Sequence, residues 1–225
     1  MCIRDSQCVA AARGDLGPAP TEIVLGTRHE LGLSWLVPML PLLREEHPHV
    51  TFHLYVGSGP DLEDRIRSQQ VDCAVSSRRI HDPGIDFLKL HEEDYCFVGS
   101  PELLARHPFA QPEDAAQHTL IDTSPETPLF GYWRDAPGGL DSLHFSGLLR
   151  MGTIAAIHAL VVHGDGVAVL PAYLVTPDIQ AGLLTRIMPA VTPLSDHFRL
   201  LFRANDPRRP IFESLARLML EQPLR

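Results

Sequence analysis

The stretch GTRHELGLSWLVPMLPLLREEHP, Gly26 to Pro48, joins a short apolar run to a long segment of helical periodicity. The run before it, Ile23 to Leu25, suits a buried strand, and apolar residues then recur at helical spacing, at Leu33, Leu36, Val37, Leu40 and Leu43. Pro38 and Pro41 leave the helix start uncertain by one turn, because proline lacks the N–H that a helix interior needs. The polar turn between strand and helix offers free backbone donors, so we expect it to hold a small anionic molecule.

The same pattern repeats after this helix. Val50 to Val56 alternates apolar with polar residues and is a predicted strand. Ser58 is placed as the N-cap of a second helix, with Asp61 three residues later as its capping-box partner. Val71 to Val75 is the next apolar run. Strand, helix, strand, helix, strand in this order predicts a parallel sheet covered by helices.

The rest of the chain predicts a second lobe. Strand signals continue at Ile85–Leu90 and Tyr95–Val98, and a short helix follows at Glu102–Arg106. Later predicted strands are Thr119–Thr123, Leu143–Leu149 and Val167–Leu170, with an irregular aromatic stretch at Phe130–Trp133. Thr153 can cap a helix that Gly164 ends, since glycine tolerates the left-handed conformation there. The final strand and helix, Phe198–Phe202 and Ile211–Leu220, are expected to return and close the first lobe.

These elements predict an α/β protein with two Rossmann-like lobes and a cleft between them. We place the first lobe at residues 21–98 plus 204–225 and the second at residues 99–203. Residues 1–20 have no sustained period and end in Gly-Pro-Ala-Pro, which is typical of a linker or a non-native tail. The hexapeptide Met1–Ser6 resembles translated adapter sequence.

Composition limits the function. The chain has 225 residues, 44% hydrophobic and 21% charged, which is enough to bury a sizeable core. Its net charge of −9 disfavours direct binding to a phosphate backbone. No apolar run has the length of a membrane span, and Cys2, Cys8, Cys73 and Cys96 form no C-x-x-C pair. We therefore expect a cytoplasmic protein that contacts no membrane.

The order of three phrases resembles the effector-binding domain of LysR-type transcriptional regulators. They are IVLGTRHELGLSWLVPMLPLLREEHPHVTFHLYVGSGPDLEDRIRSQQVDCAVSS, then YCFVGSPELLARHP, then HGDGVAVLP. The likeness covers roughly residues 21–220 and implies a fold similar to type 2 periplasmic binding proteins. It also implies a metabolite in the cleft, a homodimer or homotetramer, and DNA contact only through an N-terminal winged helix-turn-helix, which is missing here. One departure is Gln69-Gln70, where the family often has a glycine.

The resemblance to the family and the chemistry of the turns together indicate which residues bind the effector. From the first lobe they are Thr27, Arg28, His29, Ser58, Ser76 and Ser77, and from the second Thr123 and Thr153. Hydroxyls can donate and accept, and Arg28 can pair a carboxylate bidentately. Purely structural roles stay open for three of them. Ser58 and Thr153 could be helix caps only, and Arg28 could be a solvated surface charge. Tyr132 and Trp133 could line the cleft or fill a core.

Other sequence features give weaker indications of function. His29-Glu30 lacks the second histidine of a zinc protease, since position 33 is Leu33. The histidines at 47, 49 and 53 straddle a helix end and a strand, so we expect no metal, and no cofactor is implied. Two further classes remain: a free-standing solute-binding protein, which would need an export signal, and an enzyme on the same fold. We find no converging triad or carboxylate pair and expect no enzyme.

Overall fold

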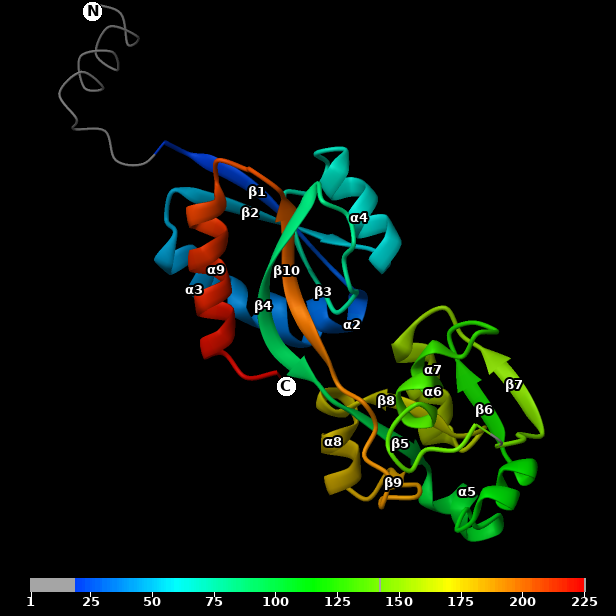
Figure 1. Ribbon diagram of the computed structural model, residues 1–225. Coiled ribbons are helices and arrows are strands. Elements are labelled where there is room, and N and C mark those ends of the chain that lie inside the picture. Colours follow the sequence, from blue (N-terminus) through cyan, green and yellow to red (C-terminus); the bar gives the residue numbers. More distant parts are fainter. Residues whose placement is uncertain (1–18, 142, 225) are drawn as a thin grey trace, which may run out of the picture.

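The computed structural model describes residues 19–141 and 143–224, which form two α/β lobes (Figure 1). The first lobe contains a five-stranded sheet in the order β2-β1-β3-β10-β4. Strand β1 (Thr21–Thr27) pairs in parallel with β2 (Val50–Val56) and β3 (Cys73–Ser76). Strand β10 (Asp196–Arg203) runs antiparallel between β3 and β4 (Ile85–Glu93). The predicted strand Val50–Val56 is confirmed residue for residue.

Helices cover both faces of this sheet. One face carries α9 (Arg209–Glu221) and a helical segment of three parts, namely α2 (His29–Leu31), a π-helical turn (Gly32–Leu36) and α3 (Val37–Glu46). The other face carries α4 (Gly59–Arg67). The π-helical turn directly precedes Pro38 and Pro41, in the region where the sequence leaves the helix start uncertain. Burial of both sheet faces agrees with the apolar runs of β1 and β3.

Gly26 lets α4 pack directly on β1. A Cβ atom at this position would lie 2.7 Å from Leu62 Cδ2 and 3.0 Å from Ala74 Cβ, closer than carbon atoms pack. Gln69, which stands where the family often has glycine, has a positive φ of 62° after the end of α4. The backbone conformation that favours glycine is therefore kept here by a residue with a side chain.

The second lobe has a smaller sheet. Strand β5 (Tyr95–Gly99) lies between β8 (Ala168–Pro171) and β9 (Thr185–Arg186). The parallel pair β6 (Thr119–Asp122) and β7 (Gly147–Arg150) joins β8 through a bridge between Leu120 and Val167. The helical elements are α5 (Pro101–Arg106), a 3-10 turn (Pro112–Gln117), α6 (Pro128–Arg134), α7 (Ile154–His163) and α8 (Ala172–Gln180).

Three predictions for the second lobe need correction. The aromatic stretch Phe130–Trp133 is not irregular but belongs to α6, whose start follows Thr127 in a left-handed conformation of φ 48°. The predicted strand Leu143–Leu149 begins only at Gly147. The lobe boundaries also differ, because β5 pairs with β8 and β10 pairs with β3 and β4. The chain therefore crosses near Asp94 and returns just before Asp196, earlier than the predicted 98/99 and 203/204.

The predicted ends of α7 are confirmed. Thr153 is the N-cap of α7, and Gly164 ends that helix with a φ of 93°. Most of the predicted tail, including Met1–Ser6, lies outside the described residues. Among the described residues, none of the helices combines the length and hydropathy needed to cross a membrane.

Candidate functional site

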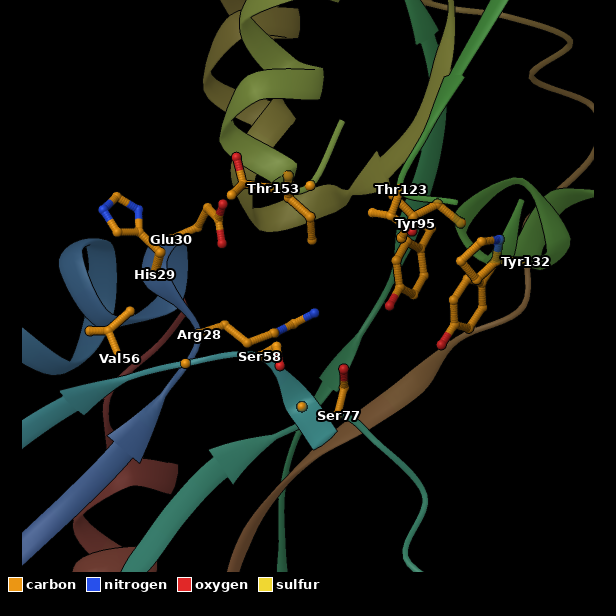
Figure 2. Close-up of a pocket in the computed structure, with 16 residues that line it drawn as sticks. Arg28, His29, Glu30, Val56, Ser58, Ser77, Tyr95, Thr123, Tyr132 and Thr153 are labelled. Atoms are coloured by element: carbon orange, nitrogen blue, oxygen red, sulfur yellow. The ribbon is translucent and has the colours of Figure 1, made fainter. Parts of the chain in front are cut away.

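A pocket of about 530 Å³ lies between the two lobes (Figure 2). Its wall includes the start of α2 and the start of α4 from the first lobe. The second lobe supplies the start of α6 and the start of α7. Helix N-termini carry unpaired N–H groups and the positive end of the helix dipole. The arrangement therefore favours a small molecule that bears negative charge.

The structure brings six of the eight candidate residues to this pocket: Arg28, His29, Ser58, Ser77, Thr123 and Thr153. The other two candidates, Thr27 and Ser76, are buried in the first lobe with exposed fractions of 0% and 2%. Ser76 Oγ accepts a hydrogen bond from the Arg78 N–H at 3.2 Å. Ser76 thus bonds within the turn after β3, whereas Thr27 Oγ1 is buried and has no hydrogen-bond partner among the described residues.

Arg28 is not a solvated surface charge. Its Nη2 donates to Oε1 of Glu93 at 2.8 Å, and the Glu93 side chain is 0% exposed. Burial alone would lower the pKa of Arg28, but the Glu93 carboxylate more than offsets this effect and holds the pKa above its usual value. One edge of the guanidinium is therefore committed to a buried ion pair, and Arg28 also lies over the Phe198 ring at 5.5 Å.

Ser58 and Thr153 act as helix caps and also line the pocket. Ser58 Oγ accepts from the Asp61 N–H at 3.4 Å, and Thr153 Oγ1 accepts from the Ala156 N–H at 3.2 Å. The Asp61 carboxylate does not complete the predicted capping box. It accepts from Tyr55 Oη at 2.8 Å and from Arg65 Nε at 2.9 Å.

The free N–H groups at the start of α6 are hydrogen-bonded by a residue of the second lobe itself. Asp122, at the end of β6, is fully buried and accepts from the N–H groups of Thr123 at 2.6 Å and Phe130 at 2.9 Å. Burial raises the pKa of this carboxyl group, and the backbone donors oppose the rise. Because Asp122 neutralises the start of α6, this helix contributes apolar surface to the pocket through Pro128 and Leu129.

Of the two aromatic residues left open by the sequence, Tyr132 lines the pocket and Trp133 is buried in the core, whereas Tyr95 and Glu30 are pocket residues that the sequence analysis missed. Tyr95 and Tyr132 stack at 3.9 Å between ring centroids and line the pocket from β5 and α6. Burial, before any other cause, raises the pKa of Tyr95 well above its usual value. Glu30 reaches from α2 to the second lobe, where Oε1 accepts from the Ala155 N–H at 2.9 Å. No local pattern signals Tyr95 or Glu30, since their partners are distant in sequence.

The returning crossing carries a polar cluster beside the pocket. Asp196, only 6% exposed, accepts from Arg199 Nη2 at 3.1 Å and from Tyr132 Oη at 3.4 Å. Arg199 belongs to the first sheet, whereas Tyr132 belongs to α6 of the second lobe. The lobes are therefore linked by a hydrogen-bonded carboxylate as well as by the two crossing chains.

Metal and thiol chemistry find no support in the described part of the chain. It contains no group of three or more His, Cys, Asp or Glu residues arranged to hold a metal ion. His47 Nε2 instead lies 3.1 Å from Ser214 Oγ. Cys73 is fully buried, and burial raises the pKa of its thiol, which makes it a core residue.

Two α/β lobes, two crossings and a pocket between the lobes define the type 2 periplasmic-binding-protein-like fold. The LysR substrate binding domain family matches residues 17–223. The chain belongs to this family.

Relatives of known class agree with this assignment. The chain is 29% identical over 165 residues to the glycine cleavage system transcriptional activator homolog of Haemophilus influenzae, covering 72% of this chain and 52% of that protein. It is 28% identical over 171 residues to the HTH-type transcriptional regulator CrgA of Neisseria meningitidis serogroup C, covering 73% of this chain and 54% of CrgA. The chain thus spans about half the length of these relatives.

Solved structures share the fold. The regulatory domain of CrgA from Neisseria meningitidis aligns with a TM-score of 0.73 at 21% identity, covering 92% of this chain and 100% of that domain. The regulatory domain of MetR from the same species aligns with a TM-score of 0.67 at 20% identity, covering 89% of this chain and 93% of that domain. The two-lobed fold expected from the sequence is confirmed.

Proposed function

We propose that this chain is the effector-sensing part of a cytoplasmic LysR-type regulator and binds a small carboxylate metabolite in the pocket between its lobes. The observation that carries the proposal is a cavity of about 530 Å³ between the lobes, whose first-lobe wall includes Arg28 and the starts of α2 and α4. This volume falls within the range of small-molecule sites, roughly 300 to 1,000 Å³. The relatives named above are transcriptional regulators, and the proposal assigns the pocket no catalytic step.

The pocket suits a carboxylate with an apolar body. The starts of α2 and α4 and the free edge of Arg28 supply positive potential from the first lobe. Hydroxyls of Ser58, Ser77 and Thr153 can donate to the same ligand. The buried Leu129 and Ile154, together with the tyrosine pair, offer the apolar side. A ligand bound to both lobes favours one lobe arrangement over others, which is how binding here would bias DNA-bound states of a whole regulator.

The test is a thermal-shift screen of the purified chain against small carboxylates and neutral analogues. A ligand at a hundredfold its dissociation constant should add about 2.7 kcal/mol to the free energy of unfolding. For a chain of this length that corresponds to a rise in Tm of roughly 5 to 10 °C. A compound that mass spectrometry finds consumed by the protein would point to an enzyme and contradict the proposal.

Paired cap variants locate the ligand. Ser58 and Ser100 both cap helices, since Ser58 Oγ accepts from Asp61 and Ser100 Oγ accepts from the Leu103 N–H at 3.3 Å. Only Ser58 faces the pocket. We expect Ser58→Ala and Thr153→Ala to weaken binding at least several-fold, and Ser100→Ala to cost a similar cap energy, about 1 kcal/mol, without changing affinity. Equal affinity in all three variants would place the ligand elsewhere.

We also propose that the chain self-associates as a homodimer or homotetramer. Leu33 and Val37, on the helical segment that follows β1, are 58% and 41% exposed, and Leu148 on β7 is 40% exposed. Leu33 and Val37 lie four residues apart on one helical segment, and neighbouring exposed apolar side chains can form the contiguous patch that marks an interface. Sedimentation velocity at micromolar concentration should give at least a dimer, and Leu33→Asp should reduce it to monomer. A monomer for the unmodified chain would contradict this prediction.

A further inference from the structure

One side chain of the first lobe occupies a helix N-terminus of the second. Glu30 lies in the first turn of α2, and its Oε1 accepts from the Ala155 N–H of α7 at 2.9 Å. Figure 2 shows Glu30 extending from α2 toward α7, beside Thr153. Glu30 and Thr153 line the same pocket. The contact therefore joins the lobes at the wall of the proposed effector site.

The sequence of α7 explains why it takes a carboxylate from elsewhere. The first turn of α7 contains no acidic residue, although a negative side chain there stabilises a helix. Thr153 Oγ1 accepts from the Ala156 N–H, so the cap of α7 serves one amide and Glu30 serves the preceding one. The positive end of α7 is thus already neutralised by an anion of the protein itself.

The buried acidic groups behind the pocket wall are engaged differently. Glu93 is paired with Arg28, and Asp122 is bonded to backbone amides within its own lobe. Asp196 also links the lobes, through Tyr132 Oη at 3.4 Å, but Glu30 is the carboxylate that reaches across to a helix N-terminus of the other lobe. It is half-buried, so a ligand can reach the space that it occupies.

We propose that Glu30 is a specificity-determining residue that holds the lobes together without effector and competes with the effector carboxylate for the start of α7. This inference rests on the proposed function. An anionic effector that reaches Ala155 must displace Glu30, so the link between the lobes then passes through the effector. A neutral analogue of the same shape neither displaces Glu30 nor is repelled by it.

The first experiment needs no ligand. Spin labels at Glu45→Cys on α3 and Ala159→Cys on α7, both exposed, report the distance between the lobes after Cys2 and Cys8 are changed to serine. We expect Glu30→Ala to give a longer mean distance and a broader distribution by pulsed electron resonance. Glu30→Gln keeps an acceptor oxygen and should stay near the unmodified protein. An unchanged distribution in Glu30→Ala overturns the role in holding the lobes together.

The second experiment uses benzoate as the anionic probe and benzamide as its neutral counterpart. Calorimetry should show benzoate binding Glu30→Ala and Glu30→Gln about two- to fivefold more tightly than the unmodified chain, the factor expected for one charge at a helix end. Benzamide affinity should not change. Glu22→Gln removes the charge of an exposed side chain on β1 and should leave both affinities unchanged.

The outcomes separate this inference from the proposed function. Equal or weaker benzoate binding in both Glu30 variants overturns the competition. Benzoate binding to no variant counts against the carboxylate pocket, and the distance measurement then decides by itself whether Glu30 holds the lobes together.

Discussion

Replacing Arg28 by methionine is expected to lower the free energy of unfolding by about 3 to 5 kcal/mol, because it leaves a buried carboxylate without its counter-charge. The Glu93 side chain is 0% exposed, and its contact with Arg28 is 2.8 Å long. Methionine keeps an unbranched apolar side chain, although it loses the contact of the guanidinium with the Phe198 ring. The loss therefore reports the ion pair more than the packing. Urea denaturation followed by circular dichroism measures it.

A double variant and a surface control complete this test. The combination Arg28→Met with Glu93→Leu should recover most of the loss, because a buried ion pair replaced by apolar groups is often nearly neutral. Arg44→Met removes an exposed arginine from α3 and should change stability by less than about 0.5 kcal/mol. A loss below about 1 kcal/mol for Arg28→Met would mean that solvent reaches Glu93 and screens it.

The second large effect is expected at Trp133. Trp133→Ala should cost about 3 to 5 kcal/mol, because it empties a site in the core of the second lobe. The residue is 0% exposed and its ring lies 5.5 Å from that of Phe97 and 5.6 Å from that of Phe130. Trp133 also anchors α6, which carries Leu129 and Tyr132 into the pocket. Ligand affinity should therefore fall together with stability, as urea denaturation and calorimetry would show.

Trp133→Phe provides the matched control. Within the part of the chain that the structure describes, the indole N–H of Trp133 has no hydrogen-bond partner. Phenylalanine removes this unsatisfied donor and keeps much of the ring, so we expect a loss well below that of alanine. A loss as large as that of Trp133→Ala would indicate that the indole N–H is bonded after all.

The parts of the fold that the sequence predicts well are those with a local physical signal. Val50–Val56 alternates because one strand has two different faces, and Gly164 marks a helix end because its φ of 93° excludes most side chains. The helix α6 gave no such signal. It has seven residues, begins after a left-handed Thr127, and takes its N-terminal partner from Asp122 on a preceding strand.

The candidate site divides in the same way. Ser58 and Thr153 are visible in the sequence because capping residues precede helices. Thr27 and Ser76 also stand at strand ends, but their side chains are buried in the first lobe. Position at a strand end does not tell whether a side chain faces the pocket or the core. The partners of Arg28 and Glu30 lie 65 and 125 residues away, so only the folded chain pairs them.

The position of β10 has a consequence for how the chain folds as it is synthesised. This strand lies between β3 and β4, yet it comes from the last thirty residues of the chain. The first lobe therefore begins synthesis earliest and completes its sheet last. The second lobe, from β5 to β9, can form its core before β10 is synthesised. Until then, the edges of β3 and β4 that pair with β10 remain unpaired. Such long-range closure slows folding, and any pause between β9 and β10 during translation would prolong the time in which those edges are open to other chains.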